Sequence, residues 1–218
     1  MNLLKPFSNT LVLLSACLLL TIPTGCSLLA TGYWIVNPND VAAEYDGLQE
    51  QRVAVVCQPN STLAFQNYGV NQELAARVSE YLRANVADIE IVSQTEVNDW
   101  IDQNELQSYG AFGTAMRADS VVVIDMSEFT LTKGTSMLQG QANIEVVVYD
   151  VETEDVQHRI ASINALYPPE NGIPVDLANQ HTSEQNFRHK FVNVLANKVS
   201  RHFYAYDSRE AIKTDRFQ

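Results

Sequence analysis

The sequence predicts a single domain of the α/β (α+β) class, in which helices pack on a mixed β-sheet of about five strands. One observation is a continuous β-branched run at residues 53–57. A second is a series of apolar residues at helical spacing, and a third is a second half that alternates like antiparallel strands. Together they predict the order β-α-β-α-α-β-β-β-α.

The first half of the domain is expected to alternate between strands and helices. Residues 53–57 suit a strand that is buried on both faces. From Asn71 onward a helix is predicted by one apolar stripe, made of Leu74, Val78, Tyr81, Leu82 and Val86. After a short strand at 89–92, Ser93 and Glu96 form a capping-box pattern. This pattern opens a helix that is expected to bury Val97, Trp100 and Ile101, and a smaller helix follows at 111–117.

The second half is expected to form a meander and a last helix. Strands are predicted at 120–129, 140–151 and 156–166, with turns at 132–135 and 152–155. Residues 168–174 are a proline-rich loop, and Thr182 begins a helix. The face of that helix is Phe187, Phe191, Val194, Leu195, Val199 and Phe203. Parallel pairing in the first half and antiparallel pairing in the second predict a mixed sheet.

The N-terminus has the pattern of a secretory signal. A short opening whose only charged side chain is Lys5 precedes an apolar run at 11–22. Pro23, Thr24, Gly25 and Cys26 follow. This arrangement resembles the lipobox of bacterial lipoproteins, although Pro23 and Thr24 stand where that family prefers Leu and a small residue. The resemblance implies cleavage before Cys26 and acylation of its thiol. Two or more acyl chains would anchor the protein stably.

Three other interpretations of this segment are open. A cleaved signal without lipid would leave Cys26 free. An uncut transmembrane anchor needs about 20 apolar residues, whereas this run is shorter and is broken by Pro23 and Gly25. A buried core helix is disfavoured, because residues 11–20 are apolar on every face and lie at the start of the chain.

The expected organisation therefore has four parts. Residues 1–25 are a signal peptide, 26–50 a lipid-anchored tether and lead-in, 51–206 the globular domain, and 207–218 a polar tail that should fray. In the tether, Tyr33 and Trp34 would lie either at the membrane interface or on the domain. Ser27 after the lipid site resembles outer-membrane sorting in some bacteria, so we expect a periplasm-facing lipoprotein in the outer rather than the inner membrane.

The charge of the chain excludes some partners. The formal net charge is −12, which argues against nucleic acid, because such binding needs basic clusters. It also argues against peripheral binding to anionic lipids, so the anchor on Cys26 would hold the membrane alone. Solubility accounts for the acidity.

The sequence contains no catalytic, cofactor-binding or metal-binding motif that we recognise. Once Cys17 leaves with the signal and Cys26 carries lipid, Cys57 is the remaining cysteine. It ends a strand, so a small buried hydrophobe is favoured over a reactive thiol. The four histidines (158, 181, 189 and 202) do not repeat at metal-ligand spacing. We therefore predict no cofactor and no metal.

Three aspartates are the candidates for acid–base chemistry. Asp99 and Asp102 lie three residues apart on one helix and share a face, and a solvated surface is the favoured interpretation. Asp125 interrupts the strand run at 121–126. It either faces solvent, which is favoured, or is buried and paired.

The domain resembles three envelope families. The features are the strand at 53–57, the capped helix after Ser93, the run from Arg117 to Ile124, and the hairpin strand that ends at Val148–Thr153. Similar features occur in the curli-secretion lipoprotein, the lipoprotein activators of penicillin-binding proteins, and the N-terminal domain of the Tol-system β-propeller protein. The resemblance implies a non-enzymatic domain that binds or assembles another envelope protein. The alternatives are a hydrolase or other enzyme acting on an envelope polymer through Asp125, and a small-ligand carrier.

Overall fold

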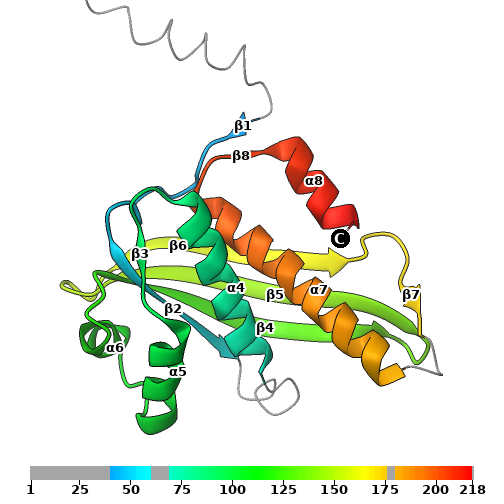
Figure 1. Cartoon of the computed structure of the whole chain (residues 1–218), viewed down its shortest axis with the longest axis horizontal. Coiled ribbons are helices and arrows are strands. Elements are labelled where there is room, and N and C mark those ends of the chain that lie inside the picture. The colour runs from blue at the N-terminus through cyan, green and yellow to red at the C-terminus, as the bar shows by residue number, and fades with distance from the viewer. Residues whose placement is uncertain (1–39, 60–68, 176–179, 218) are drawn as a thin grey trace, which may run out of the picture. The chain divides into compact units, whose positions relative to one another are not determined.

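The computed structural model describes residues 40–59, 69–175 and 180–217 (Figure 1). Its elements are β1 (Asp40–Val41), β2 (Arg52–Pro59), α4 (Val70–Asn85), β3 (Glu90–Ile91), α5 (Gln94–Gln103), α6 (Tyr109–Ala115), β4 (Ser120–Lys133), β5 (Met137–Asp150), β6 (Val156–Tyr167), β7 (Ile173–Pro174), α7 (Gln180–Ser200), the 3-10 helix η2 (Arg201–Phe203), β8 (Tyr206–Asp207) and α8 (Ser208–Phe217). From β2 to α7 the expected order of elements is confirmed, with the short strand β7 added to it. The fold class is therefore confirmed as a mixed α+β domain.

The main sheet contains six strands. Five of them lie in the order β3-β2-β4-β5-β6, and β7 pairs with β5. β2 runs parallel to both β3 and β4, whereas β4, β5 and β6 form an antiparallel meander. The expected mixed sheet is confirmed. β1 and β8 pair separately as a small two-stranded sheet.

Helices cover both faces of the sheet, and each face has its own core. α4 and α7 lie side by side across one face (Figure 1), where the larger core is centred on residues such as Leu74, Ile124, Ile144 and Phe191. α5 and α6 cover part of the opposite face over a smaller core, which includes Val97, Phe112 and Val121. The sheet is therefore covered on both faces at β2 and β4, as its continuous β-branched strands require.

α7 packs closely on the sheet because β5 has a glycine beneath it. A methyl group added at Gly140 would lie 2.5 Å from the ring of Phe191. Phe191 is 0% exposed, and its ring centroid lies 5.5 Å from that of Phe129 on β4. The expected apolar face of the last helix is confirmed, since all six of its residues are buried.

Several details of the first half differ from expectation. Ser93 is the N-cap residue of α5, but its side chain makes no capping hydrogen bond. Ile101, which was expected to be buried, is 37% exposed. The reason is its position, because Ile101 lines a pocket between the helices instead of packing into the smaller core.

The C-terminal segment that was expected to fray holds helix α8. Asp207 caps this helix, because its Oδ1 accepts a hydrogen bond from the backbone N–H of Arg209 at 2.7 Å. The same hydrogen bond is the main reason why the pKa of Asp207 is lowered. Ala211 on α8 is buried.

Candidate functional site

A pocket of about 370 Å³ lies where the parallel strands end. Carboxyl ends of parallel strands are a common position for ligand sites in α/β sheets. Half of the lining is neutral carboxamides, contributed by Gln58, Asn71, Gln72, Gln94 and Asn98. The other lining residues are Val56, Cys57, Ala75, Val97 and Ile101. We call this cavity the amide pocket.

Two residues that line the amide pocket carry a buried oxygen to which no described residue donates a hydrogen bond. Gln94 donates through Nε2 to the carbonyl of Val55 and to Oγ of Ser79, both at 3.0 Å. Its Oε1 is buried and accepts no hydrogen bond from the described residues, and the same holds for Oδ1 of Asn71. Buried polar atoms without partners are uncommon in folded proteins.

A second pocket, of about 280 Å³, shares Gln58 with the first. Tyr109 and Tyr149 line it with ring centroids 4.7 Å apart, and the Tyr109 hydroxyl donates to Oε1 of Gln58 at 3.2 Å. Burial raises the pKa of Tyr109, with smaller contributions from Tyr149 and the charge of Asp125. We call it the tyrosine pocket. Gln58 therefore belongs to two neighbouring cavities.

Asp125 is exposed, as expected. It lies opposite Gln58 of β2 and Glu145 of β5. Asp99 and Asp102 are also exposed, on the surface of α5. None of the three aspartates lines the amide pocket or the tyrosine pocket.

Cys57 behaves as a structural residue. Its side chain packs against the larger core. Burial, and to a smaller extent the nearby charge of Asp125, raises the pKa of the thiol. Because the thiolate is the nucleophilic form, a raised pKa disfavours nucleophilic chemistry at neutral pH. The hydrophobic interpretation of Cys57 is supported.

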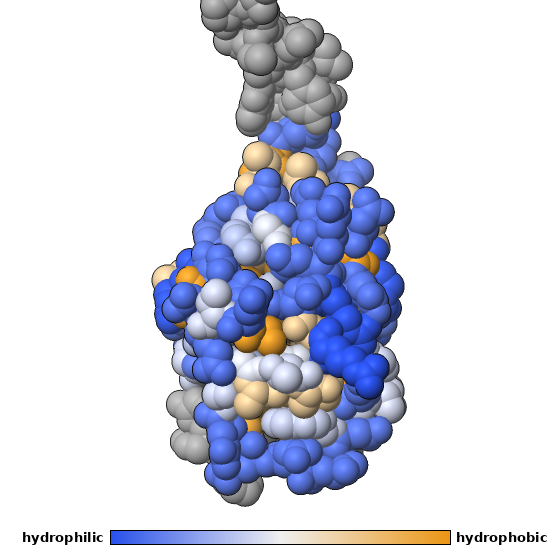
Figure 2. All heavy atoms as spheres, turned by 90° about the vertical axis from the view of Figure 1, so that its left-hand side faces the viewer, coloured by the Kyte–Doolittle hydropathy of each residue, from blue (hydrophilic) through white to orange (hydrophobic). Residues whose placement is uncertain are grey.

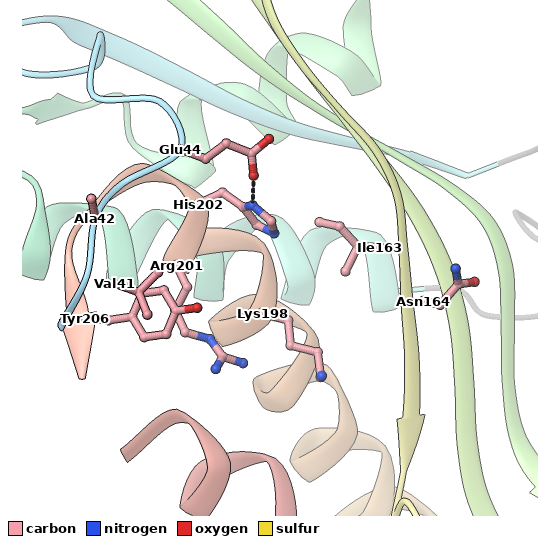
Figure 3. Close-up of a pocket in the computed structure, with 9 residues that line it drawn as sticks. All are labelled: Val41, Ala42, Glu44, Ile163, Asn164, Lys198, Arg201, His202 and Tyr206. Carbon is pink, nitrogen blue, oxygen red and sulfur yellow. Dashed lines mark hydrogen bonds and ion pairs between the residues drawn. The ribbon is translucent and has the colours of Figure 1, made fainter. Parts of the chain in front are cut away.

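A third pocket, of about 340 Å³, lies beside the lead-in segment, residues 41–50 (Figure 3). Its lining combines Val41, Ala42, Glu44, Ile163, Asn164, Lys198, Arg201, His202 and Tyr206. Glu44 reaches two histidines: its Oε2 lies 2.5 Å from Nδ1 of His202, and its Oε1 lies 3.4 Å from Nε2 of His158. Tyr45 stacks on His158, with ring centroids 4.9 Å apart. These contacts fix the lead-in segment to the domain.

Apolar surface is scattered in the described part of the chain. The exposed large hydrophobic residues are Val41, Ile101, Val156, Leu166, Ile173 and Ile212, which come from five elements. Figure 2 shows the end of the molecule that carries α6. The surface of this end is mostly hydrophilic, with small apolar areas between polar residues. This face has no wide apolar patch of the kind that marks many protein interfaces.

Some predictions lie outside the described residues. They concern Cys26, Tyr33 and Trp34, so the lipidation of Cys26 stays a prediction. Among the described helices, none has the length and apolar character needed to cross a bilayer. Within the same residues, no three His, Cys, Asp or Glu side chains gather as metal ligands would.

Comparisons with known proteins find weak structural similarity. No family model and no curated protein matches the chain. Among solved structures, a PelC dodecamer from Paraburkholderia phytofirmans has a TM-score of 0.44 and 12% identity, over 74% of this chain and 93% of that one. Lipoprotein GNA1162 from Neisseria meningitidis has a TM-score of 0.40 and 13% identity, over 67% and 98%. The C-terminal domain of LpoB from Salmonella enterica has a TM-score of 0.37 and 15% identity, over 56% and 87%. We draw no functional conclusion from similarities of this degree.

The amide pocket was missed by sequence analysis. Asparagine and glutamine carry no motif, and they are also common on ordinary surfaces. One signal was present: Gln58 is the residue before the last of β2, while Asn71 and Gln94 stand in the first turns of the helices that follow β2 and β3. In parallel α/β units these positions meet at one edge of the sheet.

Proposed function

We propose that this protein is a lipid-anchored component of the cell envelope whose domain binds another envelope protein without catalysing a reaction. The observation that carries the proposal is the chemistry of the amide pocket. Its five carboxamides donate and accept hydrogen bonds but do not titrate, and its cysteine has a raised pKa. Such a lining favours binding over proton transfer.

The anchor in this proposal is the acylated Cys26 at the start of the mature chain. The lead-in segment would join that anchor to the domain, and its contacts with His158 and His202 would fix where the anchor leaves the domain. We expect the lipid anchor to lie in the outer membrane and the domain to face the periplasm.

A small-ligand carrier is the second candidate. The volume of the amide pocket, about 370 Å³, lies within the range of about 300–1,000 Å³ that is typical of small-molecule sites. A carrier would bind its ligand without a protein partner.

The test has two parts. Intact mass of the protein purified from membranes should correspond to a chain that begins at an acylated Cys26, and Cys26→Ala should carry no lipid and be found as a soluble protein or as an uncleaved precursor. Cys57→Ala is the matched control, because it removes a cysteine but not the anchor. Cross-linking in intact cells should join the wild type to a defined envelope protein. A mature chain that begins at Ser27, or a wild type that cross-links to no envelope protein, would contradict the proposal.

A further inference from the structure

We propose that the amide pocket binds an extended, uncharged peptide segment, which adds a strand to the outer edge of β2. This inference rests on the proposed function, because it names how the partner would be held. It combines three observations: an open strand edge, buried acceptors without donors, and a lining without charge.

The pocket lies at an edge of the sheet. α4 and α5 cover opposite faces, yet both contribute to the lining: Ala75 comes from α4 and Val97 from α5. A cavity that reaches helices on both faces must lie where the sheet has ended between them. β3 provides that ending, since it pairs with β2 only at Arg52 and Val53.

Beyond these two residues, no strand among the described residues pairs with the outer edge of β2. The backbone N–H of Val92 donates to the carbonyl of Val53, and the next carbonyl on this side, that of Val55, is bonded by the Gln94 side chain. In a strand the backbone groups of alternate residues point to the same neighbour. Cys57 therefore directs its N–H and C=O to this side, where no described strand pairs with it.

The carboxamides match a peptide in hydrogen bonding. The side chains of Asn71 and Gln94 each have a buried carbonyl oxygen that accepts no hydrogen bond from a described residue. Both oxygens are inaccessible to solvent, so these two side chains would have to turn to accept from peptide N–H groups, and carboxamides can also donate to peptide carbonyls. An added strand would use Cys57 for its main-chain pairing and the amides around it for further bonds, which is the mode called β-augmentation.

The charge of the lining limits the peptide. None of the lining residues is ionisable except Cys57, whose thiol pKa is raised. A charged side chain that entered would lose its hydration without gaining a counter-charge. A saccharide would also suit the carboxamides, but it would not explain the open edge at Cys57, so a peptide is favoured.

The experiment uses the full chain in detergent and a displayed library of heptapeptides without charged residues. Selected peptides are resynthesised with acetylated and amidated ends, and each peptide nitrogen is methylated in turn. We expect binding to weaken at least tenfold when the N–H that faces the Cys57 carbonyl is methylated and to change little at the two adjacent nitrogens, because neighbouring N–H groups of a strand point to opposite sides. Hydrogen exchange of the Cys57 amide should slow at least tenfold when the peptide is bound.

A matched pair of variants locates the site. Asn98→Arg places a cation in the pocket, whereas Gln103→Arg makes the same change in charge on α5 outside the lining. Peptide affinity should fall at least tenfold in Asn98→Arg and stay within twofold in Gln103→Arg. Thermal unfolding of both variants shows whether each is folded. If Asn98→Arg unfolds, the methylation scan and the exchange of Cys57 in the wild type still decide the question.

Several results would overturn the inference. One is a library that yields no binder with a Kd below about 1 mM. Another is a methylation scan in which adjacent peptide nitrogens are equally sensitive, and a third is equal binding by both variants. Tri-N-acetylchitotriose is tested alone. If it perturbs the side-chain amides of Asn71 and Gln94 while peptides do not, the pocket is a saccharide site.

The experiments distinguish the peptide site from the proposed function. If Asn98→Arg cross-links in cells to the same envelope protein as the wild type, the pocket is not the docking site, although the proposed function stands. If the chain carries no lipid and has no envelope partner, the proposed function fails whatever the peptides do.

Discussion

Oε2 of Glu44 lies 2.5 Å from Nδ1 of His202, which joins the lead-in segment to the end of the last long helix. The backbone reinforces this contact, because the N–H groups of Glu44 and Tyr45 both donate to the carbonyl of His202, at 2.9 and 3.0 Å. Residues 158 positions apart in the chain are therefore fixed together beside the third pocket.

The first prediction concerns this contact. Glu44→Gln removes the charge and keeps the size, so the lead-in segment should be held less firmly. Glu44 is exposed, and exposed ion pairs are worth about 0.2–1 kcal/mol. We therefore expect a small change in global stability and faster hydrogen exchange at the amides of Glu44 and Tyr45. Glu50→Gln is the control, and equal exchange in both variants would show that the backbone contacts alone hold the segment.

The second prediction concerns the larger core. Phe191 is 0% exposed and packs against Phe129 and over Gly140. Phe191→Ala should lower the free energy of unfolding by about 3–5 kcal/mol, a large part of the roughly 5–15 kcal/mol of a typical domain. Lys190→Ala, an exposed change on the same helix, should stay within about 0.5 kcal/mol. Urea unfolding measures both, and a small shift for Phe191→Ala would mean that α7 is peripheral.

The packing of Phe191 also shows what sequence patterns can and cannot predict. Its period with Phe187 and Leu195 places it on the buried face of a helix, and the structure agrees. The same period does not predict that Gly140 lies beneath the ring, because that contact joins two elements whose register is set by the whole sheet. Periodicity describes one element at a time.

The candidate site was harder to predict for the same reason. Gln58, Asn71 and Gln94 gather only because β3 is short and two helices begin at one edge of the sheet. The burial of Ile101 was wrongly expected because a helical stripe does not show that one of its residues lines a pocket. The capping-box pattern placed the start of α5 at Ser93, although the side chain makes no cap.

The third prediction concerns Cys57 and pH. The pKa of its thiol is raised in the folded protein. In the unfolded protein the pKa of a cysteine thiol is about 8.5. Below that pH both states hold the proton and the stabilisation is fully present. As the pH rises above it, the unfolded state releases its proton first, so the free energy of unfolding should fall by up to about 1.4 kcal/mol per pH unit.

Urea unfolding at pH 7.5, 8.5 and 9.5 tests this dependence, and because unfolded tyrosines begin to titrate at the upper end of this range, the wild type is compared with Cys57→Ala. Cys57→Ala should remove the part of the decrease that is due to this thiol, so its curve against pH should be flatter than that of the wild type. Site-resolved alkylation by mass spectrometry should also find Cys57 slow to react in the folded chain and fast in urea. Parallel curves for wild type and Cys57→Ala would show that the thiol is not perturbed.

The last prediction concerns Asp125, where the binding and enzyme hypotheses part. Asp125→Asn keeps the size of the side chain and removes a charge that lies opposite Glu145 on the neighbouring strand. Like charges directly opposite each other destabilise a sheet, so stability should be unchanged or rise slightly, within about 0.5 kcal/mol for an exposed position. The pKa values of Cys57 and Tyr109 should both fall, because the charge of Asp125 helps to raise them. Envelope phenotype and partner binding should be retained, as in the exposed control Asp102→Asn. Loss of envelope function with an unchanged Tm and unchanged partner binding would instead assign Asp125 a catalytic role.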